Sequence, residues 1–111
     1  MKKIANYLIL TKNNDQVIVS MSAELQDDLG TIGYVKFVVG DKINLNEPIL
    51  RIEASKTIMT ITCPISGTVV AINQAAITNP LLLNSENIAE NWLIKLQDVD
   101  FAQFNALEDA I

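Results

Sequence analysis

One lysine and one nearby glutamate have types and spacing that could support chemistry. Lys56 lies in the polar segment Glu53-Ala54-Ser55-Lys56-Thr57, between two strand-like runs. This pattern is typical of a hairpin that holds a lysine at its tip. An enzyme could acylate such an amine without unfolding the chain, and the long, flexible lysine stem would become part of a swinging arm. On the pattern alone, an ordinary exposed lysine and a solubilising surface carboxylate are the alternatives.

The remaining composition excludes most catalytic and metal sites. The chain has no histidine, one cysteine (Cys63) and four glycines. It therefore has no Ser-His-Asp triad, no CxxC pair, no Cys/His zinc site and no glycine-rich phosphate loop. We expect Cys63, next to Pro64, to be a small core side chain. We predict no catalytic residue, no metal site and no enzymatic activity, so that any chemistry resides in an attached group.

Charge and hydropathy limit the partners and the compartment. Eight Lys and Arg against 13 Asp and Glu give a net charge of −5. An acidic chain without a basic stripe predicts neither nucleic-acid binding nor membrane-surface binding. Met1-Lys2-Lys3 and the short apolar run after it favour a strand over a signal peptide, and no run approaches the roughly 20 apolar residues of a membrane span. We expect a cytoplasmic protein.

The 111 residues predict one domain, residues 1–111, that is mainly β. Ser22 is a candidate N-cap and Gly30 a candidate end for a short helix. Pro48 is expected to interrupt a strand ladder because it has no N–H to donate. Trp92 and an apolar face of Phe101, Phe104 and Leu107, on a helix capped by Asp100, are predicted to pack. The expected strands are residues 7–11, 16–20, 32–38, 49–52, 58–63, 68–72 and 92–96.

Several segments together resemble the lipoyl/biotinyl-domain pattern and, more narrowly, the H protein of the glycine cleavage system. The resemblance covers nearly the whole chain. It rests on Val39-Gly40-Asp41-Lys42-Ile43, Glu47-Pro48-Ile49, Glu53-Ala54-Ser55-Lys56, Pro64-Ile65-Ser66-Gly67-Thr68-Val69, Leu25 to Ile32, Asn79 to Asn84, Trp92-Leu93-Ile94-Lys95 and Asp100 to Leu107.

This resemblance implies a fold, a cofactor and a set of partners. The fold would be a lipoyl/biotinyl-type barrel-sandwich hybrid with short peripheral helices and a C-terminal helix. Lys56 aligns with the lysine that carries lipoate in amide linkage, and Glu53 would contribute to recognition by the lipoylating enzyme, a lipoate ligase or lipoyl transferase. The chain would be a carrier whose cofactor supplies the chemistry. In glycine cleavage, the partners are the glycine decarboxylase, the aminomethyltransferase and dihydrolipoamide dehydrogenase.

Departures from the family pattern favour a narrower group. Tyr7-Leu8-Ile9-Leu10 replaces the usual His and Trp of the first strand, and Thr57-Ile58-Met59-Thr60 replaces a small, Ala-rich run. The chain is also shorter than a typical H protein. These features resemble the short bacterial H-like proteins, which serve lipoate relay or macrodomain and sirtuin-type ADP-ribosylation systems. In that group an acidic residue near the arm, such as Asp27 or Asp28, could accept ADP-ribose, although both are also ordinary solvated helix-end charges.

Three alternatives stay open. A glycine-cleavage H protein would carry the aminomethyl group. A biotin carrier would usually have Met on both sides of the lysine, whereas this chain has Ser55 and Thr57. An interaction module could keep the fold and leave Lys56 unmodified.

Overall fold

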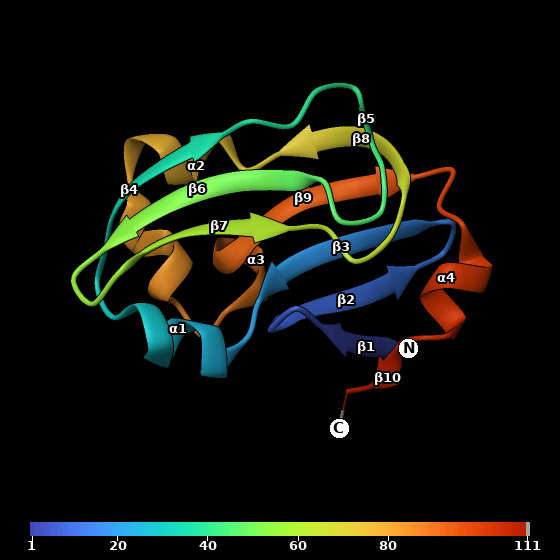
Figure 1. Cartoon of the computed structure of the whole chain (residues 1–111), viewed down its shortest axis with the longest axis horizontal. Coiled ribbons are helices and arrows are strands. Elements are labelled where there is room, and N and C mark those ends of the chain that lie inside the picture. The colour runs from blue at the N-terminus through green and yellow to red at the C-terminus, as the bar shows by residue number, and fades with distance from the viewer. Residues whose placement is uncertain (111) are drawn as a thin grey trace.

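The computed structural model describes residues 1–110, whose strands form two antiparallel sheets packed as a sandwich. One sheet has seven strands in the order β10-β1-β2-β3-β9-β8-β5, and the other has three in the order β4-β6-β7 (Figure 1). The strands are β1 (Lys2–Ala5), β2 (Leu8–Asn13), β3 (Gln16–Met21), β4 (Ile32–Phe37), β5 (Lys42–Ile43), β6 (Pro48–Ala54), β7 (Ile58–Thr62), β8 (Gly67–Ile72), β9 (Trp92–Gln97) and β10 (Glu108–Asp109). The predicted mainly-β sandwich with short helices is confirmed.

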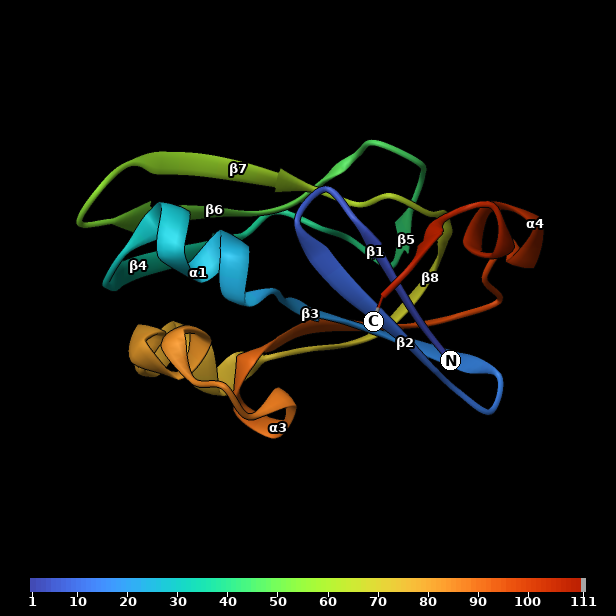
Figure 2. The same cartoon turned by 90° about the horizontal axis from the view of Figure 1, so that it is seen from below.

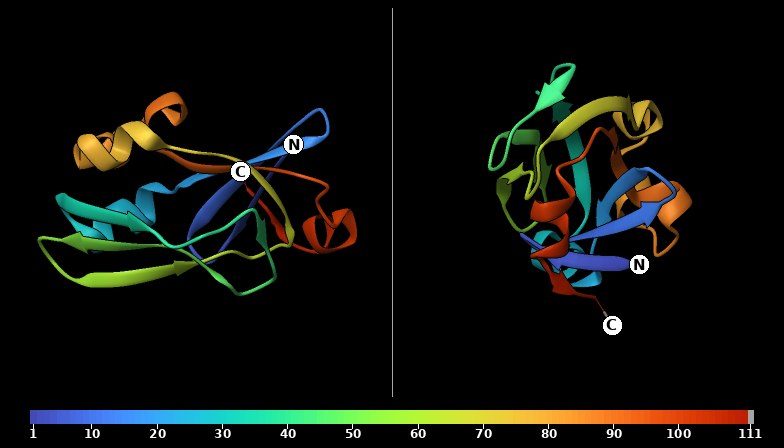
Figure 3. Two further views of the ribbon diagram at one scale, coloured as in Figure 1. Left: turned by 90° about the horizontal axis from the view of Figure 1, so that it is seen from above. Right: turned by 90° about the vertical axis from the view of Figure 1, so that its right-hand side faces the viewer.

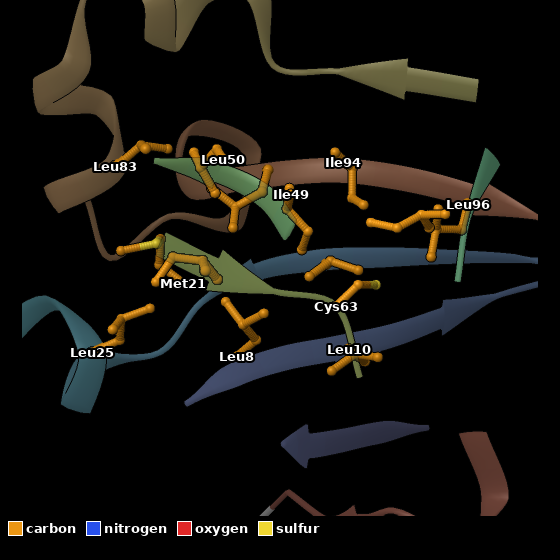
Figure 4. Packing of buried hydrophobic residues seen from close by; sticks show 14 of the residues in the cluster. Leu8, Leu10, Met21, Leu25, Ile49, Leu50, Cys63, Leu83, Ile94 and Leu96 are labelled. Carbon is orange, nitrogen blue, oxygen red and sulfur yellow. The ribbon is translucent and has the colours of Figure 1, made fainter. Parts of the chain in front are cut away.

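The core fills the space between the two sheets. Figure 2 shows β6 and β7 on one side of the molecule and β9, β8 and α3 on the other. Leu8 and Leu10 of β2, Leu50 of β6 and Ile94 of β9 are fully buried, as the alternation of apolar residues along these strands requires. Figure 4 shows Cys63 within the same cluster, and it is fully buried. Its predicted place in the core is confirmed.

Short helices close the edges of the sandwich. They are α1 (Ala23–Leu29), α2 (Gln74–Thr78), the 3-10 turn η1 (Pro80–Asn84), α3 (Ile88–Asn91) and α4 (Phe101–Asn105). As predicted, Ser22 caps α1: its Oγ accepts a hydrogen bond from the Leu25 N–H at 3.0 Å, and Gly30 follows the helix at a positive φ of 77°. Asp100 caps α4 in the same way.

The N-terminal apolar run, which the sequence indicated as a strand, is divided by a turn into two strands, β1 and β2. β1 pairs with β2 through a tight turn at Asn6 and Tyr7, whose φ angles are 53° and 62°. Two successive positive φ values are the geometry of a type I′ hairpin turn. The Asn6 side chain donates to the Thr62 carbonyl at 3.3 Å, and the Ser22 hydroxyl donates to the Tyr7 carbonyl, so the turn is fastened to both β7 and α1.

Pro48 is the first residue of β6, opposite Thr62, and the register shifts between Pro48 and Leu50, so the predicted irregularity of the ladder is found at this point. One other local expectation, the length of the C-terminal helix, was wrong. The C-terminal helix ends at Asn105 and is followed by β10, which pairs with β1. Leu107 therefore lies beyond the helix, yet it packs against the core with Phe101 while Phe104 is fully buried, so the predicted packing role of all three is confirmed.

Candidate functional site

The hairpin between β6 and β7 carries Lys56 at its turn, as the sequence predicted. The turn is closed by a hydrogen bond of 3.0 Å from the Ala54 N–H to the Thr57 carbonyl. It lies at one end of the long axis of the molecule, where the Lys56 side chain is exposed (Figures 1 and 3). The lysine therefore projects where another protein can reach it.

The backbone of this turn is held by the connection between α1 and β4. The Ser55 N–H donates to the Thr31 carbonyl at 2.9 Å, and the Lys56 N–H donates to the Leu29 carbonyl at 3.0 Å. The Thr31 N–H in turn donates to Ser55 Oγ at 2.9 Å. These bonds fix the position of the Lys56 backbone although its side chain is exposed.

Gly30 makes this close contact possible. Its φ of 77° is a conformation that other residues adopt at a cost. A Cβ at this position would lie 2.4 Å from Ser55 Oγ and 3.1 Å from Lys56 Cγ. Glycine is therefore required both by the backbone angle and by the hairpin turn that rests on it.

Asn84, at the end of η1, fastens the same connection from its other side. Its Oδ1 accepts a hydrogen bond from the Ile32 N–H at 2.9 Å, and its Nδ2 donates to the Gly30 carbonyl at 2.8 Å. Gln26 of α1 donates to the carbonyls of Leu83 and Ser85, both at 2.8 Å. No role was predicted for Asn84 or Gln26, because no local pattern indicates contacts with residues so far along the chain.

The Lys56 ammonium rests on the end of α1. Its Nζ donates to the Asp27 carbonyl at 2.7 Å. The side chain lies along an open hollow of about 470 Å³, whose lining also includes Asp27, Leu81, Asn84 and Glu86. Within residues 1–110, the amine is held by this one hydrogen bond to an exposed carbonyl, so an acyl group can be attached without displacing the core.

The other predicted site residues lie at different distances from the turn. Glu53 is half-buried on β6 and has no side-chain hydrogen bond or ion pair within residues 1–110. Asp27 and Asp28 are exposed on α1, and Asp27 lines the hollow beside Lys56. Trp92, expected in the core, is only half-buried, and Lys95 Nζ lies 4.7 Å from the centroid of its ring.

Burial raises the pKa of the Cys63 thiol from its ordinary 9.0 to about 11, although a backbone hydrogen bond with Ile65 lowers it in part. Such a thiol stays protonated near neutral pH and is a poor nucleophile. Within residues 1–110, no three Cys, Asp or Glu side chains are placed to bind a metal ion, and no helix is long and apolar enough to cross a membrane. Lys56 is an exposed amine at the turn.

Known proteins match this chain along nearly its full length. The family model "Glycine cleavage H-protein" matches residues 2–110. A "Glycine cleavage system H-like protein" of Staphylococcus aureus is 50% identical over 110 residues, which are 99% of this chain and 100% of the relative. A "Glycine cleavage system H protein" of a Synechococcus strain is 36% identical over 99 residues, 88% of this chain and 76% of that protein.

The fold agrees with these matches. A crystal structure of a glycine cleavage system H protein from Mycobacterium marinum superposes with a TM-score of 0.74 and covers 96% of each chain, at 22% identity. The family resemblance inferred from the residues is thus confirmed by sequence and by fold. The chain belongs to the glycine cleavage H-protein family.

Proposed function

We propose that this protein is a lipoyl carrier and that Lys56 is the lysine to which lipoate is attached. The observation that carries the proposal is the exposed Lys56 side chain on a firmly held hairpin turn, in a chain that belongs to the H-protein family. The protein is then a carrier and not a catalyst. The dithiolane of lipoate supplies the redox and group-transfer chemistry for which this chain has no side chains.

The attachment step requires only the Lys56 amine and a turn that holds it. The Lys56 ammonium leaves the Asp27 carbonyl that holds it at 2.7 Å and loses a proton to solvent or to the enzyme. The nitrogen lone pair then forms the amide bond with the activated carboxyl carbon of lipoate, the bond from that carbon to the activating group breaks, and the nitrogen loses a second proton to solvent or to the enzyme. The residues of the turn contribute by keeping the anchor of the arm in one place.

Glu53 is proposed as a contact for the lipoylating enzyme, a lipoate ligase or lipoyl transferase. Its carboxylate has no partner among residues 1–110 and lies three residues before Lys56 on the same hairpin. A free carboxylate at this position can pair with a cation of an approaching enzyme, and such pairs set orientation and partner choice.

We further propose that the carrier acts as an H-like protein in lipoate relay. The S. aureus H-like relative, which the chain matches over its entire length, supports this reading. The H proteins that are about a third identical support the other candidate, carriage of the aminomethyl group among the glycine decarboxylase, the aminomethyltransferase and dihydrolipoamide dehydrogenase. Exchange of glycine with bicarbonate in the presence of the cognate decarboxylase separates them: robust exchange favours glycine cleavage over the relay role.

A link to macrodomain and sirtuin-type ADP-ribosylation enzymes is the least supported part of the proposal. It rests on the exposed carboxylates of Asp27 and Asp28, the first of which lines the hollow beside Lys56. Incubation of lipoylated and unmodified protein with such an enzyme and NAD, followed by peptide mapping, tests it. Loss of the added mass in the Asp27→Asn and Asp28→Asn double variant would support the assignment, and unchanged labelling would reject it.

Intact-mass measurement tests the lipoyl attachment directly. After co-expression with a lipoate ligase, the wild type should gain the mass of one lipoyl group, and Lys56→Arg should gain none. Lys42→Arg is the matched control, since Lys42 is also an exposed lysine, and should be modified like the wild type. A lipoyl mass on Lys56→Arg, or its absence from the wild type, would show that the proposal is wrong. A streptavidin blot of the same samples tests the biotin alternative.

A further inference from the structure

Another hollow lies on the outer face of the seven-stranded sheet. It has a volume of about 320 Å³ and is lined by Ile18 of β3, Ile88 and Ala89 of α3, and Trp92 and Lys95 of β9. We call these five residues the Trp92 groove. Figure 2 shows α3 and β9 on one side of the molecule and β7 on the other, so the groove is separate from the lysine turn.

The strands direct the side chains of the groove away from the core. Val17 and Val19 of β3 are fully buried, so Ile18 between them points to the outer face of the sheet. Lys95 lies opposite Ile18 in the register and shares that face. Lys95 Nζ lies 4.7 Å from the centroid of the Trp92 ring. The groove therefore presents an apolar surface with one ammonium group on it.

The apolar part of the groove is only partly covered by the chain itself. Ile88 is 38% exposed, and Trp92 and Ile18 are half-buried. Trp92 is the single tryptophan of the sequence. Tryptophan is enriched at the centres of protein interfaces, where its large ring packs against an apolar side chain of the partner. A half-exposed tryptophan in a hollow beside isoleucine is therefore typical of a contact surface.

The charges around the groove favour an acidic partner. Lys95 is the only charged residue of β3, β8 and β9, and it has no side-chain hydrogen bond or ion pair within residues 1–110. Glu90 of α3 does not line the groove, and its Oε1 accepts a hydrogen bond from Ser85 Oγ at 2.7 Å. Asp15 and Asp98 lie in the turns at the far ends of β3 and β9, roughly 10 Å along the strands from the groove. A complementary partner therefore presents Asp or Glu to Lys95.

We propose that the Trp92 groove is a docking surface for a partner protein that packs an apolar side chain against Trp92 and Ile88 and pairs a neighbouring carboxylate with Lys95. A partner on this face leaves the Lys56 turn accessible, because the turn belongs to the three-stranded sheet on the other side of the molecule (Figure 2). This inference goes beyond the proposed function and does not depend on lipoyl attachment.

Fluorescence anisotropy with a labelled peptide tests the docking surface. The probe has six residues, a phenylalanine and a leucine between two pairs of glutamates. One control peptide has glutamines in place of the glutamates, and the other has alanines in place of the apolar pair. The probe should bind saturably and about fivefold or more tighter than either control. Its binding should also shift the emission of Trp92, the single tryptophan.

Variants of the chain locate the bound peptide. Lys95→Met should raise the Kd of the probe about fivefold or more and weaken its dependence on salt, and Ile88→Ala should raise the Kd about threefold or more. Lys42→Met, at an exposed lysine of β5, and Val38→Ala, at a residue that is 48% exposed, are the matched controls and should keep the wild-type Kd. Lys56→Arg should keep it as well, which separates this inference from the proposed function. Thermal unfolding of each variant checks that the fold is kept.

Several outcomes would overturn the inference. They include no saturable binding of the probe, equal affinity for the glutamine peptide, and the same Kd for Lys95→Met and Lys42→Met. A shift of Trp92 emission with phosphatidylglycerol vesicles, without binding of the peptide, would assign the groove to a lipid surface instead. A shift that follows the protein concentration alone, together with a doubled mass in sedimentation, would place a second copy of the chain there.

Discussion

The Lys56 side chain places a cation at the C-terminal end of α1, a helix to which it does not belong. α1 has no basic residue in its own last turn. Of its last four carbonyls, that of Gln26 accepts the Gly30 N–H, while those of Leu29 and Asp27 accept the backbone N–H and the Nζ of Lys56. We predict that neutralising Lys56 destabilises the protein, whether by substitution or by acylation.

The expected magnitude follows from the geometry. A cation near a helix C-terminus contributes about 0.3–1 kcal/mol when it is exposed to solvent. The hydrogen bond of 2.7 Å is well formed but exposed, and ordering the lysine stem opposes part of its contribution. We therefore expect Lys56→Met to lower the free energy of unfolding by about 0.5–1 kcal/mol, which corresponds to a decrease in Tm of roughly 2–5 °C in a domain of this size.

The control for this prediction is Lys42→Met, which removes the same charge from an exposed lysine of β5 that forms no side-chain hydrogen bond within residues 1–110. Thermal unfolding of both variants and the wild type should show the larger loss in Lys56→Met, and the difference should shrink at 1 M salt because salt screens exposed charges. Lipoylated wild type should unfold at a lower temperature than the unmodified protein. Equal Tm values for the two variants would refute a stabilising role of Lys56 at the end of α1.

Two further changes probe the support of the turn and the buried thiol. Gly30→Ala should lower stability by about 2–4 kcal/mol, since it adds a strained φ and a contact with Ser55, whereas Gly40→Ala, at a glycine with nothing within 4 Å of its added Cβ, should change the urea midpoint little. The pKa of the Cys63 thiol is about 11 in the fold and near its ordinary 9.0 when the chain is unfolded. The contribution of the protonated thiol to the free energy of unfolding is therefore complete below pH 9 and is lost as the pH rises to 11. Between pH 8 and 11 the wild type should therefore lose about 2–3 kcal/mol more than Cys63→Ala in urea unfolding, and parallel curves would contradict the raised pKa.

The parts of the fold that the sequence predicted are those whose signals are local. Ser22 and Gly30 mark the ends of α1 because an N-cap and a positive φ depend on one residue each. β10 was missed because it has only 2 residues and pairs with β1 more than 100 positions away, as Asp109 does with Lys3. No pattern within a short window contains that pairing.

At the candidate site, too, only the features with local signals could be predicted from the sequence. The hairpin and the position of Lys56 followed from two strand-like runs around a polar segment. The contacts that hold the turn did not, because Asp27 is 29 residues from Lys56, and the bond from Asn84 to Gly30 spans 54 residues.

The turn combines a fixed backbone with a side chain that one modification can free. The hydrogen bonds of Ser55 and Lys56 with Thr31 and Leu29 use backbone groups and a hydroxyl, so acylation leaves them intact. The bond from Lys56 Nζ to Asp27 depends on the ammonium, whose charge acylation removes. In a carrier of the proposed kind, the anchor of the arm therefore stays in place while its outer part is released. A tethered group meets its partners at an effective concentration set by the length and stiffness of the tether. A turn that moved with the arm would spread the same group over a larger volume and lower that concentration.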